Sequence, residues 1–124
     1  SGYFIGSPGM NFLDVTVDAG VVSSDGQRLG LAEDASLSGA LRLGVRPEFV
    51  EPVTRGGLDM TVAKVENHGS FQLAQLSFGA HSLMAKVDSD TFIEVGQKRP
   101  FHFASERTFL FQNKKAVSTV DTGS

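Results

Sequence analysis

The histidine and carboxylate side chains of this sequence are the groups that could bind a metal ion or transfer a proton. His68, His81 and His102 each lie in a different predicted strand or turn, whereas a metal site needs three or four converging ligands. The acidic residues between positions 88 and 94 lack the central glycine and the full acidic spacing of a calcium-binding loop. We therefore expect no metal ligand and no catalytic residue, and we interpret these side chains as parts of turns and of the surface.

The motifs of phosphate binding and of nucleophilic catalysis are also missing. A loop that holds nucleotide phosphates ends in Gly-Lys followed by Ser or Thr, and the chain has no Gly-Lys pair. Cysteine is absent, which excludes disulfides, thiolate catalysis and cysteine-ligated metals. No Gly-x-Ser-x-Gly motif presents a serine nucleophile on a turn. We expect that this chain alone binds no cofactor and does not hydrolyse ATP.

The bulk composition is that of a small folded domain with an acidic balance. The 124 residues are 40% hydrophobic and include ten Phe, enough to bury a core in one domain or in two very small ones. The net charge of −3 argues against a nucleic-acid-binding module, which needs a concentrated basic face. Phe101 and Phe103, and likewise Phe109 and Phe111, could stack on bases. We interpret both pairs instead as core residues.

Alternating apolar residues predict short β-strands in the first half of the chain. The strand that begins at Asn11 alternates up to Val17, and the strand over positions 41–45 alternates in the same way and ends at Pro47. Between these strands, Asp25-Gly26 predicts a tight hairpin turn. This half of the chain therefore predicts antiparallel β structure.

The second half of the chain predicts a meander of strands with turns near positions 67, 79 and 89. The strand from Phe71 to Phe78 keeps its apolar residues on one face only if a bulge lies near Gln75. Such regular spacing of short strands is typical of a barrel or a sandwich. From Asn113 onward the residues are small and polar, and we expect a frayed tail.

Two motifs and their order resemble one known protein family. Phe4-Ile5-Gly6-Ser7-Pro8-Gly9-Met10-Asn11 precedes Gly44-Val45-Arg46-Pro47-Glu48, and Val65-Glu66-Asn67-His68-Gly69 resembles the family's Val-Glu-x-x-Gly turn. Gly96-Gln97 resembles a further turn of the family, whereas Gly9 stands where many members have Pro or Ala. The sequence is similar to the C-terminal regulatory domain of the ATP-binding subunits of bacterial sugar-type ABC importers, a transport-associated OB (TOBE) domain.

The resemblance implies an all-β, OB-fold-like small barrel built from short antiparallel strands, or two intertwined β subdomains. Residues 1–10 would end a linker from an ATPase domain, residues 11–112 would form the regulatory domain and residues 113–124 a flexible polar tail. The domain would support ATP-driven uptake of a sugar-type solute without catalysis of its own. ATP and Mg would bind to the full-length subunit, a cytoplasmic protein peripheral to the inner membrane.

The resemblance implies partners rather than a reaction. These partners are a second copy of the parent subunit in a homodimer, the membrane permease subunits, and a regulatory protein or small ligand, but no nucleic acid. The candidate interface or regulatory residues are those of the matching motifs: Gly6, Ser7, Pro8, Met10, Asn11, Arg46, Pro47, Glu48, Glu66 and Gly69. The alternatives are a stand-alone OB module that binds a small ligand or oxyanion, and an oligonucleotide-binding OB-fold, whose salt-dependent binding to single strands we do not expect.

Overall fold

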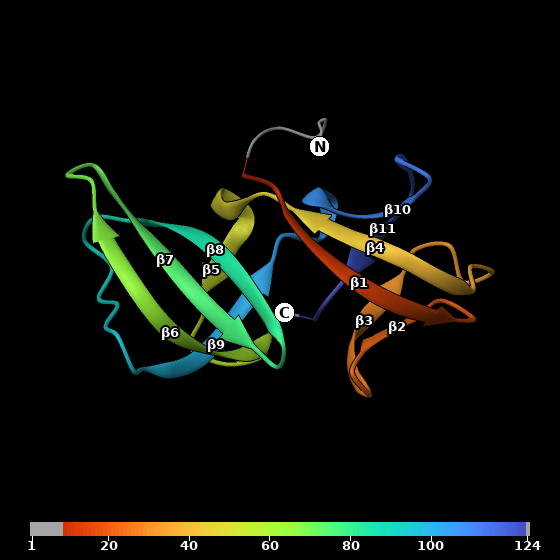
Figure 1. Ribbon diagram of the computed structural model, residues 1–124, viewed down its shortest axis with the longest axis horizontal. Coiled ribbons are helices and arrows are strands. Elements are labelled where there is room, and N and C mark those ends of the chain that lie inside the picture. Colours follow the sequence, from red (N-terminus) through yellow and green to blue (C-terminus); the bar gives the residue numbers. More distant parts are fainter. Residues whose placement is uncertain (1–8, 124) are drawn as a thin grey trace.

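The chain folds into a closed barrel and a five-stranded sheet that lie side by side along its long axis (Figure 1). The computed structural model describes residues 9–123, and among them no helix is long and apolar enough to cross a membrane. Around the barrel the strands run β1 (Asn11–Asp18), β2 (Val21–Ser24), β3 (Gln27–Ala32), β11 (Lys115–Asp121), β10 (Thr108–Gln112) and β4 (Gly39–Val45). The sheet is ordered β5 (Val50–Pro52), β9 (Lys98–Phe103), β6 (Leu58–Asn67), β7 (Phe71–Phe78) and β8 (His81–Asp88). The all-β, OB-fold-like prediction is confirmed.

The first strands form where the alternation predicts them. In β1, residues 11, 13, 15 and 17 are buried in the barrel, while the residues between them face outward. Asp25 and Gly26 join β2 to β3 with φ values of +52° and +78°, the left-handed backbone that a tight hairpin turn requires. Strand β4 ends at Val45, two residues before Pro47, as predicted.

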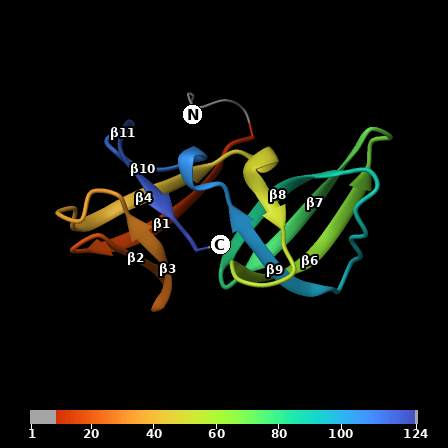
Figure 2. The same cartoon turned by 180° about the vertical axis from the view of Figure 1, so that it is seen from behind.

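The chain passes from the barrel to the sheet and back through two short 3-10 turns. Turn η1 (Pro47–Phe49) leads from β4 to β5, and turn η2 (Ser105–Arg107) leads from β9 to β10. The two turns lie next to each other (Figure 2), because the Ala104 amide donates to the Phe49 carbonyl at 3.0 Å. Arg107 also lies over the Phe49 ring, 5.3 Å from its centre. The five-stranded sheet is thus inserted between two strands of the barrel, and the two parts are intertwined.

The predicted polar tail is wrong as a structural assignment, because residues 115–121 form β11 and close the barrel. Strand β11 pairs with β10 along most of its length and with β3 only at its end. Val120 is buried in the barrel. At the contact with β3, Gly30 lies so close to the Asp121 carbonyl that a Cβ at position 30 would overlap it. The strand is held by backbone pairing and one buried side chain, which the alternation of apolar residues does not reveal.

The predicted bulge in the strand after Phe71 lies instead in the neighbouring strand. Strand β7 pairs with β8 without interruption, and the register shift occurs in β6 between Val62 and Lys64. The buried residues of β7 are consequently 72, 74, 76 and 78, whereas Phe71 and Leu73 are half-buried on its other face. An extra residue in β6 leaves the alternation of β7 intact. The apolar residues of β7 therefore lie on both of its faces, and no bulge in β7 brings them onto one.

Only one of the two phenylalanine pairs lies in the core. Phe101 and Phe103 of β9 are fully buried, as predicted. In β10 the buried residues are Thr108 and Leu110, so Phe109 and Phe111 lie half-buried on the outer face of the barrel. The core interpretation of this second pair was wrong, because alternation identifies two faces without saying which of them is inside.

Candidate functional site

The buried amide of Asn11 links the barrel to the sheet. Its Nδ2 donates to the Met84 carbonyl at 2.9 Å, and its Oδ1 accepts from the Met84 amide at 2.8 Å. The Asn11 amide thus satisfies both backbone groups of Met84 as a paired strand would. Met84 lies in β8, at one edge of the sheet. Because a buried polar group is stable only when it is hydrogen-bonded, this contact fixes where β1 meets β8.

A second link joins the β2–β3 hairpin to the start of β8. Ser24 is buried and donates from Oγ to the Asp14 carbonyl at 3.1 Å, while His81 Nε2 lies 2.7 Å from the same Oγ. A hydroxyl has one proton, so Nε2 is the donor in the second bond. Asp25 Oδ2 lies 3.8 Å from this same nitrogen. A catalytic triad needs the carboxylate on the other ring nitrogen, so the three side chains form a structural contact.

The candidate residues Arg46, Pro47 and Glu48 lie at the crossing between barrel and sheet. Pro47 is the first residue of η1, and the Phe49 amide closes the turn by donating to the Arg46 carbonyl at 2.9 Å. Arg46 and Pro47 are half-buried, whereas Glu48 is exposed. The motif therefore forms a rigid corner that presents a carboxylate to solvent.

The candidate residues Glu66 and Gly69 lie at the tip of the β6–β7 hairpin, at the end of the sheet farthest from the barrel (Figure 1). Gly69 has a φ of +85°, and its amide donates to Asn67 Oδ1 at 2.8 Å. The Glu66 carboxylate lies 3.2 Å from His68 Nε2 and 3.4 Å from Lys64 Nζ. The hydrogen bond from His68, followed by the hydrogen bond and the charge of Lys64, lowers the pKa of Glu66.

The structure brings some of the candidate interface residues together and separates others. Asn11 pairs with Val45 across β1 and β4, so Met10 and Asn11 lie beside the Arg46–Glu48 corner. Glu66 and Gly69 lie apart from them, at the tip of the β6–β7 hairpin (Figure 1). Gly6, Ser7 and Pro8 lie outside the described residues. An interface role for any of these residues remains a prediction.

The sequence reasoning missed an aromatic cluster on the outer face of the barrel. Phe12 and Phe111 meet edge to face with ring centres 5.8 Å apart, and Phe109 and Phe111 lie 6.3 Å apart. Gly44 makes room for them, since a Cβ there would lie 2.7 Å from the Phe111 ring, 3.0 Å from the Phe12 ring and 3.2 Å from the Met10 sulfur. The available signal was that Phe12, Phe109 and Phe111 alternate with buried Leu13 and Leu110. We call Met10, Phe12, Phe109 and Phe111 the outer aromatic cluster.

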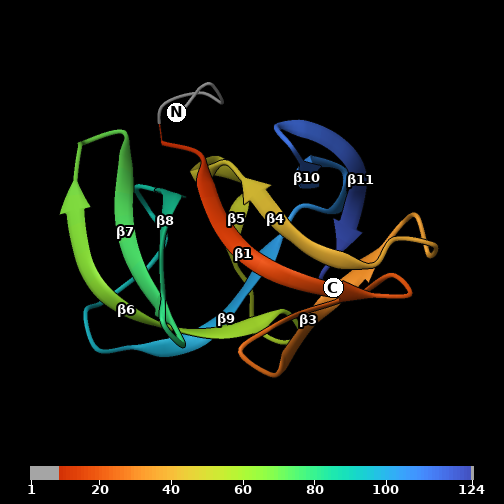
Figure 3. The same ribbon diagram turned by 45° about the vertical axis from the view of Figure 1, so that its right-hand side comes forward.

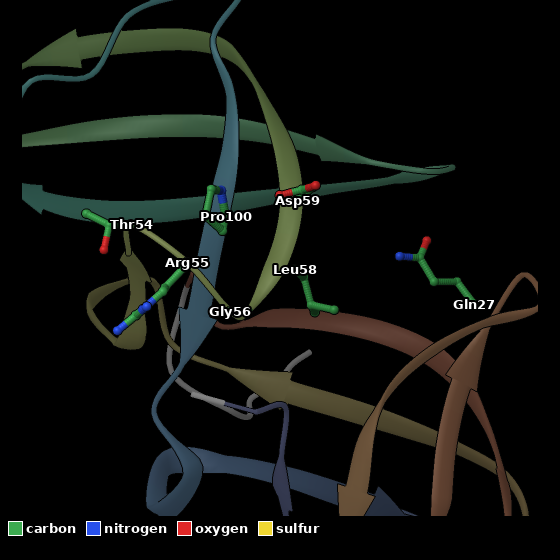
Figure 4. A pocket seen from close by; sticks show the side chains of 8 residues that line it. Gln27, Thr54, Arg55, Gly56, Leu58, Asp59 and Pro100 are labelled. Atoms are coloured by element: carbon green, nitrogen blue, oxygen red, sulfur yellow. The ribbon is translucent and has the colours of Figure 1, made fainter.

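A shallow groove separates the tip of the β2–β3 hairpin from the sheet (Figure 4). Gln27 lines it from the barrel, and Arg55, Leu58, Asp59 and Pro100 line it from the sheet side. The groove is open, and one basic and one acidic side chain, Arg55 and Asp59, are among the residues that line it. It has no convergent set of like-charged groups that would select an anion or a cation.

The histidines do not converge on a common point. His68 lies at the β6–β7 tip, His81 at the start of β8 and His102 within β9. Within residues 9–123, no three His, Cys, Asp or Glu side chains are grouped as metal ligands would be. The features that distinguish this molecule are the contacts between its two parts and the apolar surface of the outer aromatic cluster.

Comparison with known proteins agrees with this arrangement. The model of the "MalK OB fold domain" matches residues 6–50, and the model of the "TOBE domain" matches residues 43–111. The chain belongs to the TOBE domain family. The junction of the two matched segments falls at β4 and η1, where the chain leaves the barrel for the sheet. The resemblance read from the sequence motifs is confirmed.

The curated relatives of this TOBE domain are larger proteins. The chain is 30% identical over 126 residues to the sn-glycerol-3-phosphate import ATP-binding protein UgpC of Pectobacterium atrosepticum. This alignment covers 92% of this chain and 34% of that protein. It is 41% identical to UgpC of a Ruegeria species, over 87% of this chain and 31% of that protein. It is 33% identical to the multiple sugar-binding transport ATP-binding protein MsmK of Streptococcus mutans, over 87% and 33% respectively. The chain spans about a third of the length of the curated relatives it matches.

Proposed function

We propose that this TOBE domain is the regulatory and dimerisation domain of an ABC importer ATPase subunit. It would support ATP-driven uptake of a sugar-type solute and carry out no catalysis itself. The parent subunit would bind ATP and Mg, form a homodimer and attach to membrane permease subunits on the cytoplasmic side of the inner membrane. A regulatory protein or a small ligand would act through this domain.

The observation that carries the proposal is the extent of the match. Nearly the whole chain aligns with an sn-glycerol-3-phosphate import ATP-binding protein and with a multiple sugar-binding transport ATP-binding protein, yet it accounts for only about a third of each. A domain of this size leaves room in such a protein for a separate nucleotide-binding domain. The intertwined barrel and sheet also favour a role as a rigid scaffold. Two chain crossings and the contacts of Asn11 and Ser24 hold the two parts in a fixed relation.

Regulation through such a scaffold follows from differential binding. A ligand or protein that binds one arrangement of the ATPase dimer more tightly shifts the population toward that arrangement by the ratio of its two affinities. A fixed corner at Arg46–Glu48 suits this role, since a rigid surface transmits a small displacement instead of absorbing it. The proposal therefore places the Arg46–Glu48 corner at or near a contact between subunits.

The test is the dimerisation of the parent subunit after substitution of the corner. We expect Arg46→Ala and Glu48→Ala to raise the dimer dissociation constant about fivefold or more, the range of typical coupling between sites, with the fold unchanged. Glu106→Ala is a matched control, because Glu106 occupies the corresponding acidic position in η2 and is also exposed. Sedimentation equilibrium measures the dissociation constant, and thermal unfolding checks the fold.

The outcomes separate the proposal from its alternatives. If the corner variants lower the melting temperature and leave dimerisation unchanged, then Arg46 and Glu48 are structural and the corner is not an interface. If the parent protein neither binds ATP nor dimerises, but equilibrium dialysis detects a sugar phosphate or an oxyanion, then the chain is a ligand-binding OB module.

A further inference from the structure

The loop between β8 and β9 holds apolar side chains out in solvent. Only three large apolar side chains are exposed among residues 9–123, and two of them lie on this loop: Phe92 is 69% exposed and Val95 is 59% exposed. Ile93, between them, is buried in the hydrophobic core and anchors the loop. We call residues 89–97 the apolar loop. It lies on the side of the sheet away from the barrel (Figure 3).

Hydrogen bonds fix the backbone of the apolar loop at three places. The buried Gln72 side chain donates to two carbonyls at the start of the loop, each at 2.9 Å. The Arg99 guanidinium donates to the Phe92 carbonyl at 3.2 Å. The amide and the carbonyl of Val62 both pair with the last two residues of the loop, each at 2.8 Å. A loop held in this way cannot fold its apolar side chains back onto the molecule, so they stay available to a partner.

The charges around the apolar loop are mostly negative. Asp88, Asp90 and Glu94 are exposed, and no basic residue lies between positions 87 and 97. Lys98, the first base after the loop, is the start of β9. Protein interfaces combine an apolar centre with a rim of complementary charge. A partner that covers the apolar loop must therefore present an apolar surface with a positive rim.

The outer aromatic cluster is an apolar surface of this kind. Strands β1, β4 and β10 lie next to one another, with Phe12 and Phe109 each paired to Gly44 from opposite sides. The rings close over the glycine, and all four members of the cluster are half-buried, so each leaves part of its apolar surface exposed. Contiguous exposed apolar surface marks an interaction site more often than isolated exposed residues do.

Basic side chains border the outer aromatic cluster. Arg42 lies over the Phe12 ring with its guanidinium carbon 4.4 Å from the ring centre, and it is largely exposed. Lys114 and Lys115 are also exposed, in the hairpin that follows the last ring of the cluster. Asp14 Oδ1 lies 3.8 Å from Arg42 Nε. These four residues give three positive charges against one negative charge, the opposite of the balance around the apolar loop.

We propose that the apolar loop of one copy of this chain docks on the outer aromatic cluster of a second copy. The inference rests on the proposed function, in which the parent subunit forms a homodimer, and it names the surfaces through which this domain contributes. The loop belongs to the sheet and the cluster to the barrel, so a two-fold axis makes the same contact twice. Each contact covers apolar side chains at its centre and sets opposite charges at its rim.

Reversal of charge on the two surfaces of the parent subunit tests whether they meet. Asp90→Lys with Glu94→Lys makes the loop rim positive, and Lys114→Glu with Lys115→Glu makes the cluster rim negative. We expect either pair alone to raise the dimer dissociation constant about tenfold, because it places like charges opposite one another. All four substitutions together should return the dissociation constant close to the native value, because opposite charges then face one another again.

A matched control separates this effect from a general effect of charge. Asp18→Lys with Glu51→Lys reverses two exposed acids that belong to neither surface, and it should leave the dissociation constant unchanged. Sedimentation equilibrium measures the dissociation constant of each variant, and thermal unfolding confirms that each is folded. The attraction between the rims should also weaken as the salt concentration rises.

Each outcome of the charge reversal has a separate meaning. If every variant dimerises as the native subunit does, the docking proposal is wrong and the proposed function stands. If the pairs weaken the dimer but all four substitutions together do not restore it, the two surfaces do not face each other and the docking proposal is again wrong. If the native parent subunit is a monomer, the homodimer of the proposed function fails as well.

Photo-cross-linking identifies directly what covers the apolar loop. Benzoylphenylalanine in place of Phe92 reacts on irradiation with the side chains that touch it, and a mixture of isotope-labelled and unlabelled subunits shows whether the link joins two copies. We expect mass spectrometry to place the cross-link on Met10, Phe109 or Phe111 of the second copy. Benzoylphenylalanine in place of Leu31, the third exposed apolar residue, is the control and should give no link to the cluster. Links from position 92 to another protein, or to another surface of the second copy, would contradict the proposal.

Discussion

Substitution of Asn11 tests how the barrel and the sheet are held together. Asn11→Ala removes two hydrogen bonds, of 2.9 and 2.8 Å, from a side chain that is 7% exposed. Each bond contributes about 1 kcal/mol net, and a buried polar group left unpaired costs about 1–3 kcal/mol. Met84 lies on an edge strand and is half-buried, so water can reach part of the freed backbone. We therefore expect the free energy of unfolding to fall by about 2–3 kcal/mol.

Urea unfolding followed by far-UV circular dichroism measures this loss. The matched control is Asn67→Ala, which removes one hydrogen bond to the Gly69 amide from an exposed asparagine. A surface substitution of that kind changes stability by about 0.5 kcal/mol or little more. Amide hydrogen exchange adds a local readout, because the Met84 amide should exchange faster in Asn11→Ala than in the native chain.

Two results would contradict this role of Asn11. A loss no greater than that of Asn67→Ala would mean that the Asn11 amide contributes nothing that water does not replace. Unchanged exchange of the Met84 amide would mean that another group protects it. Either result would show that the Asn11 side chain does not hold β1 against β8.

Three further changes probe the barrel closure and the hairpin tip. Gly30→Ala places a Cβ on the Asp121 carbonyl and should cost about 3 kcal/mol, the upper end for overpacking, as measured by urea unfolding. Truncation after Gln112 removes β11 and opens the barrel, so calorimetry should detect a much lower melting temperature or no cooperative transition. NMR titration should give Glu66 a pKa below its ordinary value, and His68→Ala should raise it. Because folding lowers the pKa of Glu66, its contact with His68 and Lys64 stabilises the fold at pH values above the unfolded-state pKa. This contribution is lost as the pH falls through the folded-state pKa. A Glu66 pKa at its ordinary value would contradict the expected effect of this contact.

The local elements of the fold could be predicted from the sequence because their signals are local. Alternation placed β1 and β4, and Asp25-Gly26 placed a hairpin, since these residues favour the left-handed backbone of a tight turn. The alternation of β1 also contained the signal for Asn11, which shares the buried face with Val15 and Val17. A polar residue on a buried face must have a partner, although that partner, Met84, is 73 residues away.

What the sequence could not predict depended on contacts between distant segments. Strand β11 buries one apolar side chain, Val120, and owes its place to backbone pairing with β10 and β3. The bulge in β6 followed from its pairing with β7, because alternation alone does not say which of two strands contains the extra residue. The outward direction of Phe109 and Phe111 followed from the burial of Leu110 between them.

The coding sequence upstream of Ser1 tests the proposed function most directly. The chain accounts for about a third of its relatives, so the account predicts an in-frame segment of roughly two hundred codons, the size of one further large domain. That segment should encode a Gly-Lys-Ser or Gly-Lys-Thr phosphate-binding loop. A start codon directly before Ser1 would contradict the proposal that this domain serves an ATPase subunit.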